Sequence, residues 1–317
     1  MRPTDRVYVA GHRGLVGSAI VRRLEAAGFD RVITRTRAQT DLRDPAAVDA
    51  LFRTERPTHV FLAAARVGGI LANASYPADF IRENLAIELN LVDAAHRHGV
   101  EKLLFLGSSC IYPKHAPQPM KEEHLLTGPL EPTNSAYAIA KIAGIEMCRA
   151  YNKQHGTRYI SAMPTNLYGP GDNFDLQNSH VLPALLRKVH EAKEQGREEV
   201  VLWGTGTPRR EFLHVDDLAD ACVFLMQQNE TPDLVNVGVG KDLTIAELAE
   251  LIADVVGYTG RFVYDSSKPD GTPRKLLDVS RMQALGWEAR IPLREGVSET
   301  YTWFREHVAQ AAPAVSR

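Results

Sequence analysis

Residues 7–17 read VYVAGHRGLVG, and they decide the fold because an apolar run, a glycine-rich turn and a helical pattern follow one another without interruption. The run Val7 to Ala10 is apolar throughout, which is typical of a parallel strand covered on both faces. The helical pattern from Leu15 to Ala27 ends at Gly28, a residue suited to a left-handed C-terminal cap. The stretch therefore predicts the first strand, turn and helix of a βαβ unit.

The turn predicts a dinucleotide site. Gly11, Gly14 and Gly17 have the spacing G-x-x-G-x-x-G. Without side chains, they let the backbone approach a pyrophosphate, which then lies against free N–H groups and the positive end of the helix. A glycine triplet alone is weak support, because the chain has 23 glycines. Its position directly after the first strand makes the prediction specific.

The end of the second expected strand decides between NAD and NADP. Residues 34–37 read TRTR and offer no carboxylate for the ribose hydroxyls of NAD. Arg13, Arg35 and Arg37 can instead bind a 2′-phosphate, so NADP(H) fits better than NAD. The alternative is that these arginines are solvated loop residues. Asp41 and Leu42 are expected to pass beside the adenine.

The rest of the chain extends the α/β pattern. Alternating apolar runs and helical segments predict a Rossmann-type doubly wound parallel sheet over residues 1–164, which would bind NADP. After Pro164 the pattern becomes turn-rich, which indicates a smaller α/β substrate-binding lobe over most of residues 165–317. Part of that half, about residues 210–240, is expected to return to the sheet. The further strands of the sheet are expected at residues 32–34, 60–64, 103–107 and 159–163.

Composition excludes several classes of protein. A formal net charge of -2 argues against a nucleic-acid or membrane-surface partner held by charge. The three cysteines are widely spaced, so they predict neither a disulfide framework nor a thiolate metal site. The first residues contain no apolar run long enough for an export signal, which makes the cytoplasm the expected compartment.

A tyrosine and a lysine begin the helical pattern that covers residues 136–154. Tyr137 and Lys141 are four residues apart, so they share one face of the helix. A lysine ammonium near a phenol favours the phenolate, so we expect the pKa of Tyr137 to lie below its ordinary value of about 10. Such a phenol exchanges protons with a carbonyl or an alcohol oxygen. Ser108, just beyond the fourth expected strand, can bind the same oxygen.

The glycine turn, Ser108 and the Tyr137–Lys141 pair together resemble the extended short-chain dehydrogenase/reductase family. Sites of that family combine such a turn, a serine and a Tyr-Lys pair around a nicotinamide. Residues 209–217, RREFLHVDD, are similar to the R-x-F-x-H-V-D-D segment of the branch that acts on nucleotide sugars.

Longer segments narrow the resemblance to the GDP-sugar epimerase-reductases of this family. These enzymes epimerise carbons 3 and 5 of GDP-4-keto-6-deoxy-D-mannose and reduce its ketone at carbon 4 with NADPH. Related 4,6-dehydratases are expected to carry Thr-Asp-Glu where this chain has Ser-Ser-Cys. The likeness extends from residue 7 to about residue 305. It rests on residues 11–14 (GHRG), 63–70 (AAARVGGI), 107–114 (GSSCIYPK), 164–170 (PTNLYGP) and 268–275 (KPDGTPRK).

The resemblance implies that Cys110 is the base and His180 the acid of the epimerisation. The substrate ketone acidifies the protons on both adjacent carbons, so a base and an acid on opposite ring faces can invert each centre. Without the resemblance, Cys110 could be a small buried hydrophobe and His180 a polar residue before the helix near Pro183.

Further site residues also follow from the resemblance. Lys188, Trp203, Arg210 and Asp278 are expected to bind the GDP-sugar, although Trp203 could instead belong to a hydrophobic core. The residues expected to bind NADP(H) are Gly11, His12, Arg13, Gly14, Leu15, Val16, Gly17, Arg37, Asp41, Leu42, Leu106, Gly107, Ser108, Ser109, Lys141, Pro164, Thr165, Asn166, Leu167 and His180.

The helix expected at residues 79–98 has apolar residues on more than one face. One face can cover the sheet, while the other meets either a second subunit or a neighbouring helix of the same chain. We expect a homodimer formed through the helices at residues 79–98 and 136–154. Two other functions stay open: a related nucleotide-sugar epimerase or ketoreductase, and a regulator that senses NADP without catalysis.

Overall fold

A six-stranded parallel sheet forms the centre of the protein in the computed structural model, which describes residues 1–176, 179–268 and 270–310. Its strand order is β10-β5-β4-β3-β1-β2, and every neighbouring pair is parallel. From β1 the chain continues to β2 on one side and then to β3 on the other. A crevice for a ligand is therefore expected at the carboxyl end of β1. The strands are β1 (Val7–Ala10), β2 (Val32–Ile33), β3 (His59–Leu62), β4 (Lys102–Leu106), β5 (Tyr159–Pro164) and β10 (Leu234–Val237).

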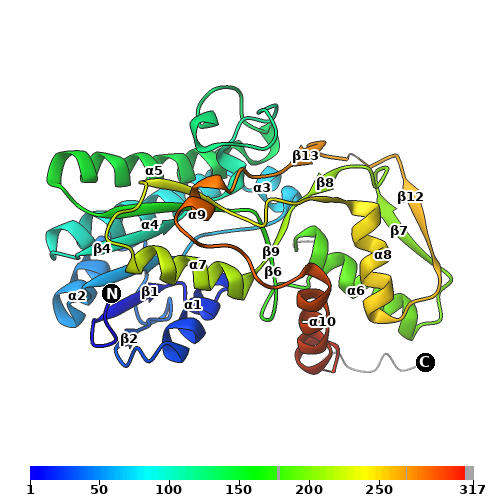
Figure 1. Cartoon of the computed structure of the whole chain (residues 1–317), viewed down its shortest axis with the longest axis horizontal. Helices are drawn as coiled ribbons and strands as arrows, with labels where there is room; N and C mark the ends of the chain where they lie inside the picture. The colour runs from blue at the N-terminus through cyan, green and yellow to red at the C-terminus, as the bar shows by residue number, and fades with distance from the viewer. Residues whose placement is uncertain (177–178, 269, 311–317) are drawn as a thin grey trace.

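Helices cover both faces of this sheet, which confirms the predicted doubly wound α/β fold (Figure 1). Alternate strand residues supply two separate cores: Tyr8 packs toward one face and Val9 toward the other. The first face is covered by α2 (Pro45–Glu55), α4 (Pro77–Arg97) and α5 (Ser135–His155), and the second by α1 (Leu15–Ala26) and α7 (Val215–Gln227).

A smaller lobe with its own core lies on the side of the molecule away from the N-terminus (Figure 1). Its helices are α6 (Val181–Glu194), α8 (Ile245–Val256) and α10 (Leu293–Phe304), and its paired strands are β7 (Glu199–Trp203) and β12 (Arg261–Asp265). A small sheet joins β8 (Arg209–Arg210), β11 (Leu243–Thr244) and β13 (Arg274–Lys275), while β6 (Asn166–Tyr168) pairs with β9 (Phe212–His214). The remaining short elements are α3 (Ile70–Ser75), α9 (Ser280–Ala284), η1 (Ser109–Ile111), η2 (Glu122–His124), η3 (Pro132–Asn134) and η4 (Arg305–Ala309).

Residues 215–237 lie with the first domain, because α7 covers the sheet and β10 adds to its edge. The structure also packs Met282 and Trp287 against that face, so a second segment of the C-terminal half returns to the sheet.

Helix α4 packs against α5 and α2 of the same chain, yet Leu89 on α4 keeps 55% of its surface exposed. Among the described residues, no helix combines the length and the apolar character that a membrane span needs.

A buried carboxylate joins the lobe to the sheet. Glu211 is 0% exposed and accepts hydrogen bonds from the backbone N–H groups of Val239, Gly240 and Leu277, at 2.6, 2.7 and 2.9 Å. Burial raises the pKa of Glu211, and these three N–H groups oppose that shift. The bonds tie the segment before β9 to the chain after β10 and after β13, and thereby set the position of the lobe relative to the strand ends.

Candidate active site

The turn after β1 packs so closely against other backbone that Gly11 and Gly17 have no room for a side chain. Gly11 has φ +87°, and a Cβ there would lie 2.8 Å from the backbone of Ala64. A Cβ on Gly17 would lie 2.1 Å from the carbonyl oxygen of Gly11. The N-cap of α1 is Gly14, which provides no side-chain hydrogen bond, and the first turn of α1 contains no acidic residue. The first amides of α1 are therefore free to bind an anion such as a pyrophosphate.

The arginines near this turn differ in their partners. Arg35 forms an ion pair with Glu55 of α2, so its charge is already matched within the protein. Arg37 is 69% exposed and lies 4.0 Å from Asp41. A hydrogen bond from Arg43 lowers the pKa of Asp41 to about 2, so Asp41 is a paired carboxylate. Arg37 and the exposed Arg13 are therefore the arginines of this group best placed for a phosphate.

The other residues expected to bind the cofactor gather at the same edge of the sheet. Because β1, β3, β4 and β5 are parallel neighbours, their carboxyl ends lie together. Residues 106–109 follow β4, and residues 164–167 follow or end β5. The N–H of Gly107 donates to the carbonyl of Ala162 at 2.9 Å, which keeps these two segments side by side beyond the strands.

Ser108 and Tyr137 contact each other at this edge. The hydroxyl of Ser108 lies beside Tyr137 and opposes the rise of its pKa, and it also accepts the N–H of Cys110 at 3.3 Å. Burial raises the pKa of Tyr137 above its ordinary value, and the nearby Cys110 and Glu88 raise it further. The predicted lowering of the phenol pKa by Lys141 is therefore wrong, because burial dominates and Lys141 is paired with another residue.

That partner is Glu88 of α4, which the sequence analysis missed. The Nζ of Lys141 lies 3.1 Å from Oε1 of Glu88, and both side chains are buried, at 2% and 1% exposure. The same Nζ lies 4.6 Å from the centre of the Phe105 ring on β4. The one signal in the sequence is an acidic residue within an apolar helical stretch, between Ile87 and Leu89.

Cys110 contacts Lys275 of the second lobe, and the charge of Lys275 also acts on His180. The Nζ of Lys275 on β13 lies 3.8 Å from the sulfur of Cys110. His180 is the N-cap of α6, and its pKa is lowered by the protein around it and by the positive charge of Lys275. Cys110 is partly exposed, so it is not a buried core residue, unlike Cys148 and Cys222.

The expected nucleotide-binding residues of the second lobe also meet. The Nζ of Lys188 lies 5.3 Å from the centre of the Trp203 ring, and that of Lys268 lies 5.8 Å from it. Trp203 is 63% exposed, so the core alternative is wrong for it. Burial lowers the pKa of Arg210, and the nearby Asp270 opposes this shift. Lys268 and Asp270 are further residues that the sequence analysis did not assign to the site.

Asp278 lies in the segment between β13 and α9. Its carboxylate accepts the N–H and the hydroxyl of Ser280, at 2.9 and 2.5 Å. Its backbone N–H donates to the carbonyl of Met120. Tyr112 holds the loop between Cys110 and Met120, because its hydroxyl donates to the side chain of Asn236 at 2.5 Å.

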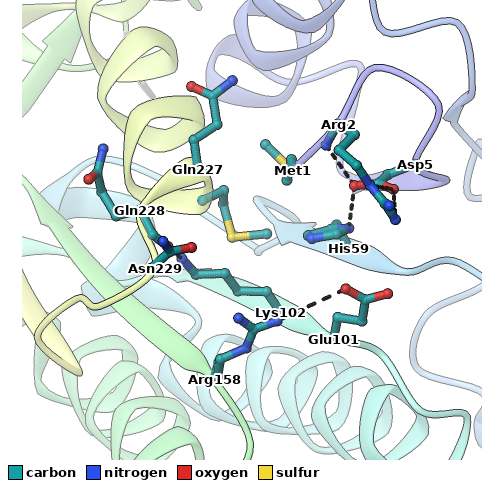
Figure 2. A pocket seen from close by; sticks show the side chains of 11 residues that line it. Met1, Arg2, Asp5, His59, Glu101, Lys102, Arg158, Gln227, Gln228 and Asn229 are labelled. Atoms are coloured by element: carbon teal, nitrogen blue, oxygen red, sulfur yellow. Dashed lines mark hydrogen bonds and ion pairs between the residues drawn. The ribbon is translucent and has the colours of Figure 1, made fainter.

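A separate cavity lies at the opposite end of the sheet. It measures ≈ 330 Å³ and is lined by residues at or just before the starts of the strands, among them Asp5, His59 and Lys102 (Figure 2). The Nζ of Lys102 donates to the carbonyls of Leu225 and Gln228, at 2.8 and 2.7 Å, at the C-terminal end of α7. Among the described residues, no group of three or more His, Cys, Asp or Glu could hold a metal ion.

The fold and the carboxyl-edge site define a class. A doubly wound sheet with an uncapped helix beside its phosphate turn, and a serine–tyrosine contact within the same crevice, is the arrangement of a nicotinamide-dependent short-chain dehydrogenase/reductase. The chain belongs to the NAD dependent epimerase/dehydratase family, whose family model matches residues 7–238.

Within that family the chain has close relatives. It is 60% identical to GDP-L-fucose synthase 1 of Arabidopsis thaliana, over 96% of this chain and 94% of that protein. It is 59% identical to GDP-L-fucose synthase of Escherichia coli K12, over 96% of this chain and 97% of that protein. A solved GDP-mannoheptose C4 reductase from Campylobacter jejuni with NADP bound superposes with a TM-score of 0.90 at 39% identity, over 96% of this chain and 99% of that one.

Proposed function

We propose that the protein converts GDP-4-keto-6-deoxy-D-mannose to GDP-L-fucose by epimerisation at carbons 3 and 5, followed by reduction of the ketone at carbon 4 with NADPH. The names of two relatives that match nearly the whole chain support this reaction. The single observation that carries it is the partly exposed Cys110, which contacts Lys275 and lies beside the Ser108–Tyr137 pair. These contacts support one site that carries out both halves of the reaction.

The epimerisation falls to Cys110 and His180. The thiolate of Cys110 removes the proton next to the substrate ketone, and the enolate oxygen takes the charge. The protonated form of His180, which its lowered pKa makes a stronger acid, then donates a proton to the same carbon from the opposite face and inverts the centre. The ammonium of Lys275 donates to the sulfur at 3.8 Å and holds it in place. Solvent restores both protonation states before the second centre reacts.

The reduction falls to Tyr137 and Ser108. Bound NADPH supplies a hydride to carbon 4, and the residues of the chain provide the matching proton. Tyr137 gives this proton to the ketone oxygen, while Ser108 holds the same oxygen by a hydrogen bond. Burial keeps Tyr137 protonated, which is the form that a reduction requires.

The remaining side chains bind the two ligands. Arg13 and Arg37 are positioned to bind the 2′-phosphate of NADP(H), and the open N-terminus of α1 its pyrophosphate. In the second lobe, Lys188 and Arg210 supply cations for the pyrophosphate of GDP, and the exposed Trp203 offers a flat surface to guanine. Asp278, in the segment after β13, is proposed as a further residue that binds the GDP-sugar.

The experiment is to incubate the protein with GDP-4-keto-6-deoxy-D-mannose and NADPH, and to follow both NADPH absorbance and the product. The reaction run in deuterium oxide is expected to place deuterium at carbons 3 and 5 of GDP-L-fucose. Cys110→Ser is expected to abolish this incorporation and still reduce the unepimerised ketone. A wild-type protein that leaves NADPH unchanged would contradict the proposal.

A ketoreductase of another GDP-sugar is the second candidate, favoured by the likeness to the GDP-mannoheptose C4 reductase. It predicts oxidation of NADPH without exchange of deuterium at carbons 3 and 5. The same incubation therefore separates the two functions. A regulator without catalysis predicts neither signal and would not need the contact between Ser108 and Tyr137.

Two further parts of the proposal concern assembly and compartment. A homodimer through α4 and α5 is supported by Leu89 and Ile139, which are 55% and 48% exposed on these helices. A cytoplasmic location is supported by the free state of Cys110, Cys148 and Cys222, because disulfides are rare in reducing compartments.

A further inference from the structure

An acidic side chain connects two strands of the small sheet that carries Arg210 and Lys275. Asp242 lies just before β11, and its side chain is only 5% exposed. One carboxylate oxygen accepts the Nε–H of Arg209 on β8 at 2.9 Å, and the other accepts the Nε–H of Arg274 on β13. The backbone carbonyl of Asp242 accepts a further bond from Arg209, at 3.0 Å. Asp242 therefore holds β8 and β13 together through the two arginines.

The residues that follow Arg209 and Arg274 are cations of the proposed site. Strands β8 and β13 are parallel, and their register places Arg210 opposite Lys275. Since successive side chains of a strand point to opposite faces, these two cations leave the sheet on the face away from the carboxylate. On that face, the Nζ of Lys275 lies 3.8 Å from the sulfur of Cys110. The carboxylate thus acts on one face of the sheet, and the site lies on the other.

The guanidinium of Arg210 also depends on the backbone of its neighbour. It donates to the carbonyl of Arg209 at 2.7 Å, so a shift of Arg209 displaces it. The N–H of Arg209 in turn donates to the carbonyl of Pro273, just before β13, at 2.8 Å. Burial lowers the pKa of Arg210, and Asp270 and Cys110 oppose this shift, so both groups lie near the guanidinium. A change in the packing of β8 against β13 would therefore move Arg210 within the site.

The bonds of Asp242 fix geometry more than they stabilise the fold. Burial alone would raise the pKa of Asp242, but hydrogen bonds from Arg274 and Arg209 lower it below its ordinary value. The carboxylate is therefore charged at neutral pH, and its bonds to both arginines are charge-assisted. The side chains of Arg209 and Arg274 are 38% and 43% exposed, and ion pairs of such exposed groups contribute little to the free energy of unfolding.

We propose that Asp242 is a positioning residue for the GDP-sugar site: it keeps β8 and β13 in the register that directs Arg210 to the pyrophosphate of the substrate and Lys275 to the sulfur of Cys110. Asp242 acts through these two cations and does not touch the substrate. The inference rests on the proposed function, because the GDP-sugar is the ligand that Arg210 binds there. NADPH is bound by the turn after β1 in that proposal, so its binding does not depend on Asp242.

The test is Asp242→Asn, which keeps the shape of the side chain and removes its charge. Its Kd for GDP, measured by isothermal titration calorimetry, is expected to rise by about 10-fold, because a displaced guanidinium loses charge-assisted bonds to the pyrophosphate. The KM for the keto sugar is expected to rise with it, while the KM for NADPH stays as in the wild type. A variant that only folds less well would instead lower kcat and leave the Kd and both KM values unchanged.

Glu247→Gln is the matched control. Glu247 is an exposed carboxylate that lies 3.8 Å from the same Arg209, so its loss removes a charge near β8 and leaves the bonds of Asp242 in place. Its Kd for GDP is expected to equal that of the wild type. An increase as large as that in Asp242→Asn would mean that the charge near Arg209 matters and the connection between the strands does not, which contradicts the inference.

A second variant covers the case in which Asp242→Asn does not fold. Arg209→Met removes one of the two ion pairs and leaves the carboxylate bonded to Arg274, and it is expected to raise the Kd for GDP by a smaller factor. An active wild type with an unchanged Kd and KM in the folded variants overturns the inference alone. A wild type that does not oxidise NADPH with the keto sugar overturns the proposed function, and the inference falls with it.

Discussion

The ammonium of Lys275 lies 3.8 Å from the sulfur of Cys110, although the two residues come from different lobes and are 165 positions apart in the chain. Cys110 is held by the strand end of the nucleotide-binding domain, and Lys275 by the short sheet of the second lobe. The contact with the sulfur therefore depends on the packing of one lobe against the other. In the proposed reaction, the ammonium keeps the sulfur in place for removing a proton from carbon.

Lys275→Met is accordingly expected to slow epimerisation and to spare reduction. Loss of the ammonium removes the group that holds the sulfur in place, so deuterium exchange at carbons 3 and 5 is expected to fall by about 10- to 100-fold. Lys275→Arg, which keeps the charge, should restore most of the exchange rate, and Lys241→Met is a surface control. Equal loss of exchange and reduction would contradict this role.

Tyr137→Phe is expected to lower the kcat of reduction by about 100- to 10,000-fold, because the ketone oxygen loses its proton donor. The Phe80 ring lies edge-on to Tyr137 at 6.3 Å, a contact that phenylalanine keeps, so the fold should be retained. Deuterium exchange at carbons 3 and 5 is the internal control and should persist. The assigned role fails if reduction continues at the wild-type rate.

Arg37→Ala is expected to raise the KM for NADPH by about 10-fold and to change the KM for NADH little, because only NADPH carries the 2′-phosphate. Arg35→Ala is a matched control two residues away. Its guanidinium is paired with Glu55, so its removal should affect the two cofactors alike. Steady-state kinetics with each cofactor provide the measurement. A larger preference change in Arg35→Ala than in Arg37→Ala would place the phosphate elsewhere.

Local features of the site could be predicted from the sequence, because each depends on neighbouring residues. The apolar run before Gly11 and the glycine after α1 set the bounds of the first βαβ unit to within a residue. The spacing of Tyr137 and Lys141 placed them on one helix face, and the strand ends collected the cofactor segments at one edge.

Features that depend on distant residues could not be predicted in this way. The partner of Lys141 is on another helix, and that of Cys110 is in another lobe. The pKa of Tyr137 was expected to move in the wrong direction because spacing shows the nearby charge but not the burial that outweighs it. Trp203 is a similar case. An aromatic residue in a strand is compatible with a buried core position, and only the structure shows that Trp203 is exposed.

Leu89→Glu combined with Ile139→Glu is expected to give a folded monomer if α4 and α5 form the subunit interface. A charge in an apolar interface stays unpaired and opposes association. Sedimentation velocity measures the mass of the particle, and circular dichroism checks the fold. Val201→Glu is the matched control, because Val201 is a 48% exposed apolar residue in the second lobe. A dimer that survives the double variant would place the interface on other elements.

The stability of the protein is expected to fall with acid partly through His59, at the start of β3. Burial lowers the pKa of His59 from 6.5 to about 4, and the charge of Asp5 opposes this shift. Between these values the unfolded chain binds a proton that the native protein does not, so the free energy of unfolding falls as the pH drops from about 6.5 through 4. The contribution of His59 is about 3 kcal/mol at most, from the size of the shift. His59→Gln should therefore flatten the decline in Tm over this range, whereas His115→Gln, which replaces an exposed histidine, should leave its slope unchanged. A decline in His59→Gln as steep as in the wild type would mean that other buried histidines, such as His214, account for the acid sensitivity.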